Sequence, residues 1–202
     1  GTGTLLLAAS SNVTVTSASV TAVSIVAADM EVSCHHVSAG SAAVSIEPSA
    51  TADSTLRVGS VGSGLSLSAA ELARIDTTSS LRLGGRLTAT VVIDDITYGG
   101  SASTLEVSAG RDAARLVRFS GSAASSFVGP SSVSVMSRGD VEFSQGLTVA
   151  GGLSLTADSD CNGSGTLTVA SGASVSSTNS AVDVSVDDLA LGGSVDAGTA
   201  SL

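Results

Sequence analysis

The sequence contains no lysine and no tryptophan, and only one tyrosine, three phenylalanines and two cysteines among 202 residues. Eight arginines face 18 acidic residues, so the formal net charge is −10. Neutralising phosphates requires a basic surface, so this balance excludes nucleic acid as a partner. The scarcity of aromatics disfavours an immunoglobulin-like sandwich, whose core usually holds a tryptophan and a tyrosine near a disulfide. The one tyrosine, Tyr98, precedes Gly99 and Gly100, and we expect it at a turn.

Long apolar runs are also missing. The longest extends from Leu5 to Ala9, whereas a membrane-spanning helix needs about 18 consecutive apolar residues. We therefore expect no membrane span in this segment. Ordinary disorder is excluded as well, because 43% of the residues are hydrophobic and only 13% are charged. The chain has enough apolar surface to build a core.

The charge is spread unevenly along the chain. Residues 1–56 carry −4, residues 57–138 carry +2 and residues 139–202 carry −8. The first interpretation is solubility and mutual repulsion of neighbouring surfaces. The second is attraction between an acidic end of one copy and the mildly basic middle of another.

Short apolar alternations recur along almost the whole chain, each closed by Gly, Ser, Asn or Asp. Typical members are Val44-x-Ile46, Leu105-x-Val107 and Leu153-x-Leu155. Strict alternation over three to five residues predicts strands with one face buried and the other exposed.

A longer period lies over this alternation. Related segments recur at 55–59, 80–84 and 104–108, and again at 147–151, 167–171 and 189–193. Self-similarity at this spacing, roughly 20–25 residues, is typical of a β-solenoid. We predict an all-β parallel β-helix of about nine coils, each of roughly 20–25 residues. Residues 1–202 are expected to form a single β-solenoid segment of a longer repetitive chain.

Two stretches interrupt the strands with a helical pattern. Ser68 and Glu71 have the spacing of a capping box, which predicts one turn of helix leading into Leu72. Residues 111–116 have a similar pattern.

The segment 64–75, GLSLSAAELARI, followed by LRLGG at 81–85, resembles the repeats of filamentous-haemagglutinin-type adhesins. The match is strongest over residues 64–85. Members of that family are large secreted surface proteins with parallel β-helical stalks. The resemblance therefore implies this fold and an extracellular, cell-surface location, and it carries over no catalytic residue.

Cys34 and Cys161 lie about six predicted coils apart along the axis, too far for the Cα separation of about 7 Å that a disulfide tolerates. Either both thiols are free and packed in the core, or they form intermolecular disulfides with another subunit. Cys34 with the neighbouring His35 and His36 supplies too few ligands on one side of a strand for a metal. We expect no metal and no cofactor.

Acidic pairs stand at Asp94–Asp95 and Asp187–Asp188, with Asp158 and Asp160 near the second pair. Glycosidases and lyases with β-helical folds build clefts from such carboxylates. The alternative is that these acids are solvated at strand ends and corners. A third interpretation is adventitious binding of calcium at Asp158 and Asp160.

Three short motifs have functional interpretations. Arg138-Gly139-Asp140 matches the tripeptide that integrins recognise, although its glycine also suits a corner between two strands. Asn12 and Asn162 begin possible N-glycosylation sequons, an interpretation that requires a secreted eukaryotic protein.

These observations predict a structural, non-catalytic rod of an extracellular or cell-surface protein. It would be an adhesin stalk or a segment of a surface filament such as a fibre or flagellar hair. Neither end of the sequence carries an obvious cap, so we expect other domains, or other copies stacked end to end, to cover open strand edges. Host or matrix glycans are further candidate partners. The alternative is a carbohydrate-binding or carbohydrate-active β-helix acting on polysaccharide.

Overall fold

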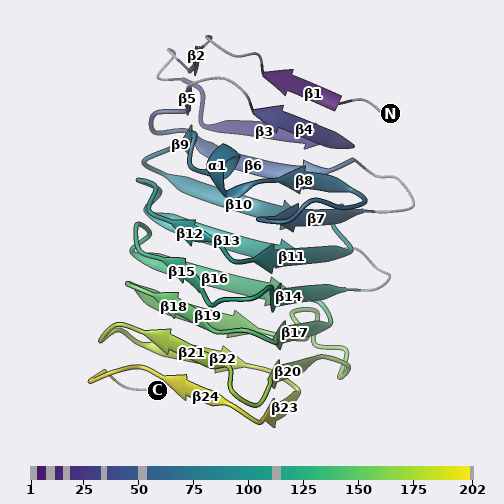
Figure 1. Cartoon of the computed structure of the whole chain (residues 1–202), viewed down its shortest axis with the longest axis vertical. Coiled ribbons are helices and arrows are strands. Elements are labelled where there is room, and N and C mark those ends of the chain that lie inside the picture. Colours follow the sequence, from purple (N-terminus) through teal and green to yellow (C-terminus); the bar gives the residue numbers. More distant parts are fainter. Residues whose placement is uncertain are drawn as a thin grey trace.

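The computed structural model describes residues 4–7, 12–15, 19–32, 36–49, 54–110 and 115–200. Over these ranges the chain winds into a stack of coils made of short strands, with its N-terminal and C-terminal parts at opposite ends of the stack (Figure 1). All strand pairs described between neighbouring coils are parallel; those from β10 to β13 and from β13 to β16 are examples. The protein is therefore a parallel β-solenoid, as the sequence predicts.

Three faces run along the stack, which we call faces I, II and III. Face I is one sheet, in spatial order β3 (Ala22–Ala27), β6 (Ala43–Pro48), β10 (Ser80–Gly85), β13 (Thr104–Ala109), β16 (Ser132–Ser137), β19 (Gly152–Thr156) and β22 (Val182–Ser185). Face II is a second sheet, in order β8 (Leu65–Leu67), β7 (Thr55–Val58), β11 (Thr90–Asp94), β14 (Leu116–Ser120), β17 (Asp140–Phe143), β20 (Thr166–Val169) and β23 (Asp188–Leu191). Face III contains β12 (Thr97–Tyr98), β15 (Ser125–Phe127), β18 (Leu147–Val149), β21 (Ser174–Ser177) and β24 (Ser194–Asp196).

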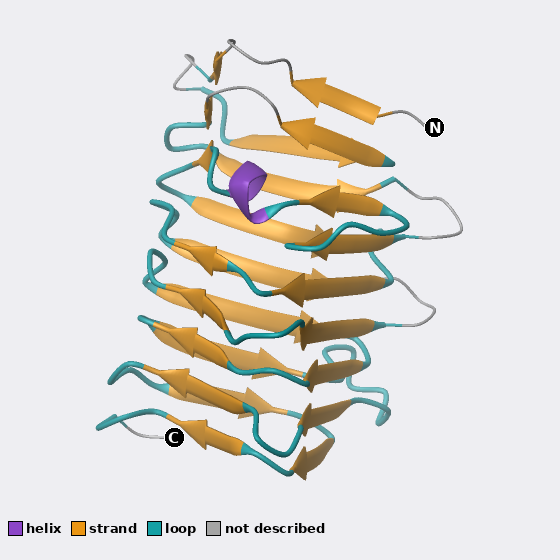
Figure 2. Ribbon diagram, in the orientation of Figure 1, coloured by secondary structure: helices purple, strands orange, loops and turns teal. Residues whose placement is uncertain are grey.

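Two smaller sheets complete the N-terminal part. One pairs β1 (Thr4–Leu7) with β4 (Asp29–Val32), and the other contains β2 (Asn12–Thr14), β5 (His36–Ser38) and β9 (Ile75–Asp76). A single helical turn, α1 (Ala69–Leu72), lies against this part of the stack (Figure 2). No helix among the described residues has the length and apolar character needed to cross a membrane.

The strands form where the sequence alternates, because alternation places every second side chain inside the coil. In β16, for instance, Val133 and Val135 are buried while Ser132 and Ser134 lie outside. The register of the strand pairs then places apolar inward residues of one coil against apolar inward residues of the next. The inner column of face I contains Leu81, Leu105, Val133, Leu153 and Val182, all of them buried.

The few aromatic residues gather in the middle of this core. Phe119 and Phe143, on neighbouring strands of face II, stack with their ring centroids 4.7 Å apart, and Phe127 meets Phe119 edge-on at 6.4 Å. Tyr98 is also a core residue, so the predicted turn position is wrong. It belongs to β12, is 1% exposed and pairs with Phe127. Its neighbour Gly100 makes room for it, since a Cβ there would lie 2.2 Å from the tyrosine oxygen.

The stack has about seven turns, and the predicted number of nine is therefore too high. The coils are unequal in length. Val133 pairs with Leu153 and Val44 pairs with Leu81, yet the stretch of chain between the second pair is nearly twice as long as that between the first. The longer interval contains β7 and β8, which both belong to face II, together with α1 and β9, so one fixed period counts two coils where face I gains a single strand.

The repeated segments show the same effect. Leu81 pairs with Leu105, and Leu167 pairs with Leu189, which confirms that each of these two intervals is one coil. Leu56 belongs to face II and pairs with Val91, so its interval to Leu81 is not one coil. Likewise, β18 belongs to face III and β20 to face II, so the interval between these two strands joins two faces. Similar segments occur on different faces because the strands of every face bury every second side chain and therefore need the same apolar alternation.

The predicted capping box is present at α1. The Ser68 hydroxyl accepts from the Glu71 amide, and the Glu71 carboxylate accepts from the Ser68 amide. Glu71 also accepts from the Val32 amide at 2.8 Å, and Arg74 donates to the Val32 carbonyl. Side chains therefore satisfy the backbone of β4 at the place where α1 stands. The second helical pattern falls largely on residues 111–114, outside the described residues, and its last residue, Leu116, begins β14.

Strands β7 and β8 depart from the regular winding. They run parallel on the same face although only residues 59–64 connect them. Gly59 makes this return possible, because its φ is +97° and a Cβ there would lie 1.8 Å from the Asp94 carbonyl oxygen. Only glycine adopts such a conformation at so close an approach without strain.

Candidate functional site

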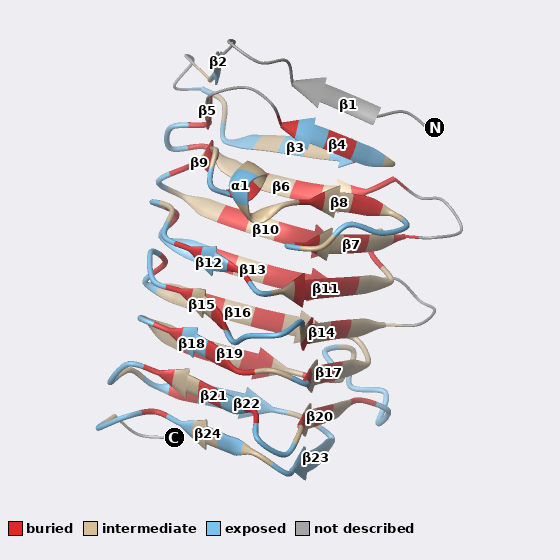
Figure 3. Cartoon of the chain, viewed as in Figure 1, coloured by how far each residue is buried: buried red, intermediate tan, exposed pale blue. Residues whose placement is uncertain are grey.

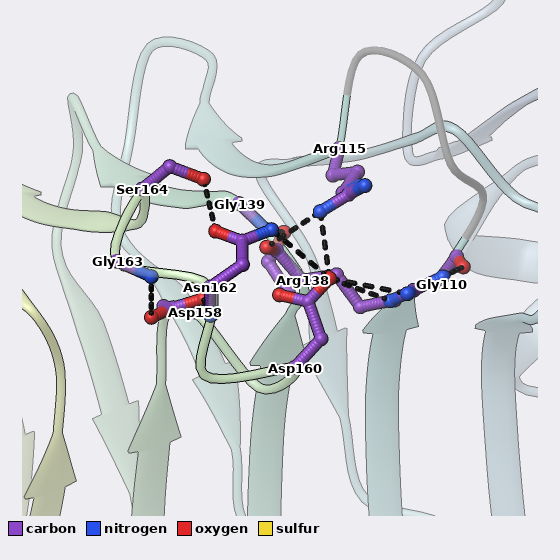
Figure 4. Close-up of polar contacts among 10 residues, drawn as sticks. Gly110, Arg115, Arg138, Gly139, Asp158, Asp160, Asn162, Gly163 and Ser164 are labelled. Atoms are coloured by element: carbon purple, nitrogen blue, oxygen red, sulfur yellow. Dashed lines mark hydrogen bonds and ion pairs between the residues drawn. The ribbon is translucent and has the colours of Figure 1, made fainter.

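A charged cluster among the described residues joins three consecutive coils at the corner between faces I and II (Figure 4). Arg115 precedes β14, Arg138 lies between β16 and β17, and Asp160 lies in the turn between β19 and β20. One carboxylate oxygen of Asp160, Oδ2, is 2.8 Å from Arg115 Nη1 and 3.1 Å from Arg138 Nη2. We call these three residues the corner cluster. It ties successive coils together outside the backbone ladder.

The turn that carries Asp160 is held by its own first residue. Asp158 accepts from the amides of Asn162 and Gly163 at 2.9 and 2.8 Å. Desolvation raises the pKa of Asp158, but these hydrogen bonds, with help from Asp160 and Arg115, lower it by more, so the net shift is downward. The carboxylate is therefore the favoured form and fixes the turn.

This turn is a poor cation site despite its acidic residues. Both oxygens of Asp158 accept backbone hydrogen bonds, and two guanidinium groups contact the Asp160 carboxylate. A cation placed there would meet two positive charges at close range. No group of three or more His, Cys, Asp or Glu residues in the described part of the chain is arranged to hold a metal.

The tripeptide 138–140 is occupied by internal contacts. Arg138 pairs with Asp160 and also donates to the Gly110 carbonyl at 3.2 Å, while Asp140 accepts from the Thr166 amide at 2.9 Å. Gly139 forms the corner between β16 and β17, as the second interpretation expects. Both charged ends of the motif thus serve the fold.

Cys161 is exposed and free, in the same turn as Asp160. Its placement in a core, one of the two expectations, is therefore wrong, because its φ of +54° belongs to the turn and not to a strand. Asn162 is also exposed, and its amide donates to Asp160 at 3.1 Å. Cys34 and His35 fall outside the described residues, as does the side chain of Asn12 in β2.

The two acidic pairs do not meet. Asp94 ends β11 and accepts from the hydroxyls of Ser60 and Ser120. Asp95 accepts from the amides of Ser122 and Ala123, which lower the pKa of its carboxyl. Asp188 begins β23, four strands further along face II. At about 4.8 Å per strand, the pairs are too far apart to form one catalytic cleft.

The outer surface of face I is shallowly hollowed. A groove of about 430 Å³ crosses β3, β6, β10, β13 and β16. Its walls are small residues such as Ala43, Ser80 and Ser132, and its charged members are Arg82 and Glu106, which pair at 2.9 Å. This groove can accommodate a polar chain lying along the stack.

The corner cluster and the Arg82–Glu106 pair are absent from the sequence-based candidates. One signal could have identified such pairs. The sequence separation of Arg82 and Glu106 is 24, and Arg118 and Glu142, which also pair, have the same separation of 24. Opposite charges separated by one coil length indicate partners on adjacent coils. In the corner cluster, Arg138 and Asp160 are 22 residues apart, which is also one coil length, whereas Arg115 and Asp160 are 45 apart and give no such signal.

Comparison of the chain with models of known protein families, with curated proteins and with solved structures found no match. The fold and the geometry of the described residues therefore carry the functional argument.

Proposed function

We propose that this chain is a structural, non-catalytic rod of an extracellular or cell-surface protein. The observation that supports it is the continuity of the ladders. Faces I and II each contain seven parallel strands in one uninterrupted sheet. Each coil contacts chiefly its neighbours, so stiffness extends along the axis and stability grows with every added coil.

The resemblance of residues 64–85 to adhesin repeats gives the proposal its biological setting. A parallel β-solenoid is compatible with the stalks of that family. Under this proposal the rod is an adhesin stalk that presents a distal domain, or a segment of a surface filament. Exposed Cys161 would then be available for an intermolecular disulfide, and exposed Asn162 for glycosylation.

Electron microscopy of the native material, without and with a reductant, tests the proposal. Filaments of uniform width indicate a polymer subunit, and separate rods ending in a knob indicate a stalk. Compact particles without any extended rod would contradict both. If filaments disperse on reduction, Cys34 or Cys161 forms the joint. Failure of Cys161→Ser to form filaments, with the matched turn variant Ser159→Ala forming them normally, assigns the joint to Cys161, and failure of Cys34→Ser alone assigns it to Cys34.

The groove on face I favours a second candidate, a carbohydrate-binding solenoid. Its length across five strands and the Arg82–Glu106 pair among its small apolar and hydroxyl residues suit a glycan chain. A glycan array probed with the intact chain and with Arg82→Gln tests this function. Binding that the substitution weakens supports the candidate, and no binding to any glycan by the folded chain eliminates it.

A further inference from the structure

The turn between β19 and β20 places an asparagine directly before a glycine. The chain has three asparagines, at positions 12, 162 and 179, and only Asn162 is followed by glycine. Residues 161–164 are all exposed, in the turn that projects from the stack beside β20 (Figure 3). The amide nitrogen that follows an asparagine can attack the side-chain carbonyl carbon, and a following glycine, without a Cβ, shields that nitrogen least. Asn162 is therefore the asparagine of this chain most open to intramolecular attack.

The structure places a proton acceptor on the attacking nitrogen. The Gly163 amide donates to Asp158 Oδ2 at 2.8 Å, and Asp158 Oδ1 accepts from the Asn162 amide at 2.9 Å (Figure 4). The Asp158 carboxylate is thus oriented toward the N–H group that has to lose its proton. A base within hydrogen-bond reach of the proton that it removes meets the geometric requirement for general-base catalysis.

A second hydrogen bond lies at the carbonyl group that is attacked. The Ser164 hydroxyl donates to Asn162 Oδ1 (Figure 4). Negative charge develops on this oxygen when the Gly163 nitrogen adds to Asn162 Cγ, so the hydroxyl is placed as an oxyanion donor. The approach is also unobstructed, because a Cβ at Gly163 would meet no atom within 4 Å and residues 162–164 lie outside the strands.

We propose that this turn promotes the conversion of Asn162 to aspartate and isoaspartate, with Asp158 as general base and Ser164 as oxyanion donor. The Gly163 nitrogen passes its proton to the Asp158 carboxylate and forms a bond to Asn162 Cγ. The Cγ–Nδ2 bond then breaks, and the side-chain nitrogen leaves as ammonia with that proton. Water opens the resulting cyclic imide at one of its two carbonyl carbons and yields aspartate or isoaspartate. Water is consumed, ammonia is released and nothing is oxidised.

The conversion changes the corner cluster. Before it, Asn162 Nδ2 donates to Asp160 Oδ2 at 3.1 Å, the oxygen that Arg115 and Arg138 also contact. A carboxylate at position 162 loses this hydrogen bond and adds a negative charge beside Asp160. Isoaspartate also lengthens the backbone and displaces the amides from which Asp158 accepts. The modified turn therefore holds the corner less firmly.

The rate of conversion is measured on the intact folded chain at neutral pH, by peptide mapping with mass spectrometry and by the ammonia released. The reference is a synthetic peptide of residues 157–166, which contains the same groups without the fold. We expect Asn162 to convert at least about tenfold faster in the folded chain than in the peptide. Asn179, which precedes a serine, is the internal control and should convert more slowly than Asn162.

Two substitutions test the assigned roles. Asp158→Asn removes the base with little change in size, and Ser164→Ala removes the oxyanion donor. Each should slow the conversion by about tenfold or more. Two matched controls should stay within about twofold of the wild type, since Ser164→Thr keeps the hydroxyl and Ser159→Ala alters a side chain outside these hydrogen bonds. Circular dichroism confirms that each variant is folded.

The effect on the corner has its own readout. The variant Asn162→Asp reproduces one product of the conversion and should melt at a lower temperature than the wild type. The matched variant Asn162→Gln keeps an uncharged amide and should convert far more slowly, because attack on its longer side chain has to close a larger ring.

Two results would overturn the inference. One is a folded chain in which Asn162 converts no faster than it does in the peptide. The other is a folded Asp158→Asn variant that converts as fast as the wild type or faster, because the hydrogen bonds of the turn would then restrain Asn162 and not activate it. An Asn162→Asp variant that melts at the wild-type temperature or above would overturn the proposed effect on the corner cluster.

Discussion

Residues 80–196 and residues 19–76 hold their coils together by different means. In the first region, every coil contains one strand on each of the three faces, from β10–β12 to β22–β24. In the second region, β7 and β8 share a face, α1 stands between β8 and β9, and the Glu71 and Arg74 side chains satisfy the backbone of Val32. Where the ladder is continuous, any apolar residue of suitable size serves. Where it is interrupted, particular polar side chains are required.

The largest effect should come from the regular region. Phe119→Ala removes a fully buried ring that contacts Phe127 and Phe143. We expect a loss of about 3–5 kcal/mol in the free energy of unfolding, because the rigid ladders prevent collapse around the cavity. Chemical denaturation measures it. Leu189→Ala, on the half-exposed last strand of the same face, is the control and should cost less than about 1 kcal/mol. Equal costs would contradict the description of the core.

The corner cluster should come next. Asp160→Asn removes the carboxylate that both Arg115 and Arg138 contact, at a site where the aspartate side chain is 18% exposed. We expect a loss of about 2–3 kcal/mol, somewhat below that of a fully buried ion pair. Denaturation monitored by circular dichroism measures it, with Asp187→Asn in the exposed last coil as a neutral control. A loss below about 0.5 kcal/mol would mean that the cluster does not stabilise the corner.

The irregular region gives a smaller effect that depends on pH. Desolvation raises the pKa of Glu71, but hydrogen bonds from Ser68 and Val32, together with Arg74, lower it by more and leave it below the ordinary value of 4.5. The carboxylate therefore stabilises the fold above pH 4.5, and this contribution is lost as the pH falls through the lowered pKa. Glu71→Gln should cost about 1–2 kcal/mol at pH 7.

Thermal melts at pH 7 and pH 3 measure this contribution. The difference in melting temperature between the two pH values should be smaller in Glu71→Gln than in the wild type. Glu106→Gln, in the regular region, is the matched control. A wild-type difference that Glu71→Gln leaves unchanged would show that this carboxylate is not responsible.

A substitution at Tyr98 should raise the free energy of unfolding, whereas the preceding ones lower it. Its hydroxyl is buried and has no hydrogen-bond partner among the described residues. Tyr98→Phe should stabilise the protein by about 1 kcal/mol. Burial, with a contribution from the negative charge of Asp76, raises the pKa of Tyr98 to about 12.

The unfolded chain releases this proton near pH 10, so stability should fall as the pH rises from 10 towards 12. Absorbance at the tyrosinate band reports Tyr98 alone, because the chain has one tyrosine. A titration midpoint near 10 in the folded protein would contradict the burial of this hydroxyl.

The smallest effect belongs to the exposed ladder pairs. Arg118 and Glu142 are 43% and 32% exposed, so solvent screens their attraction. Glu142→Gln should cost less than about 0.5 kcal/mol, and the cost should vanish at high salt. Denaturation at low and high salt measures it. A cost comparable with that of Asp160→Asn would show that exposed pairs contribute as much as the corner cluster.

The sequence predicts the fold well because strand alternation is a local property. It predicts the capping box at Ser68 and Glu71 for the same reason. Prediction from the sequence fails where contacts between residues far apart in the chain determine the structure. The number of coils depends on intervals of unequal length between paired strands, and Tyr98 is buried because Phe127 pairs with it on the next coil and Gly100 leaves it room. The corner cluster joins residues from three coils, so no local pattern contains it.

The unequal connections have a consequence for how such a chain can change. The corner between faces I and II has only residues 138–139 between β16 and β17 but residues 157–165 between β19 and β20, and Val141 and Leu167 are nevertheless register partners. An insertion at a corner is thus absorbed where it occurs and shifts no residue of the core. The corners are accordingly the positions at which a foreign peptide can be grafted, and the turn at 158–165, which projects from the stack, is one such position.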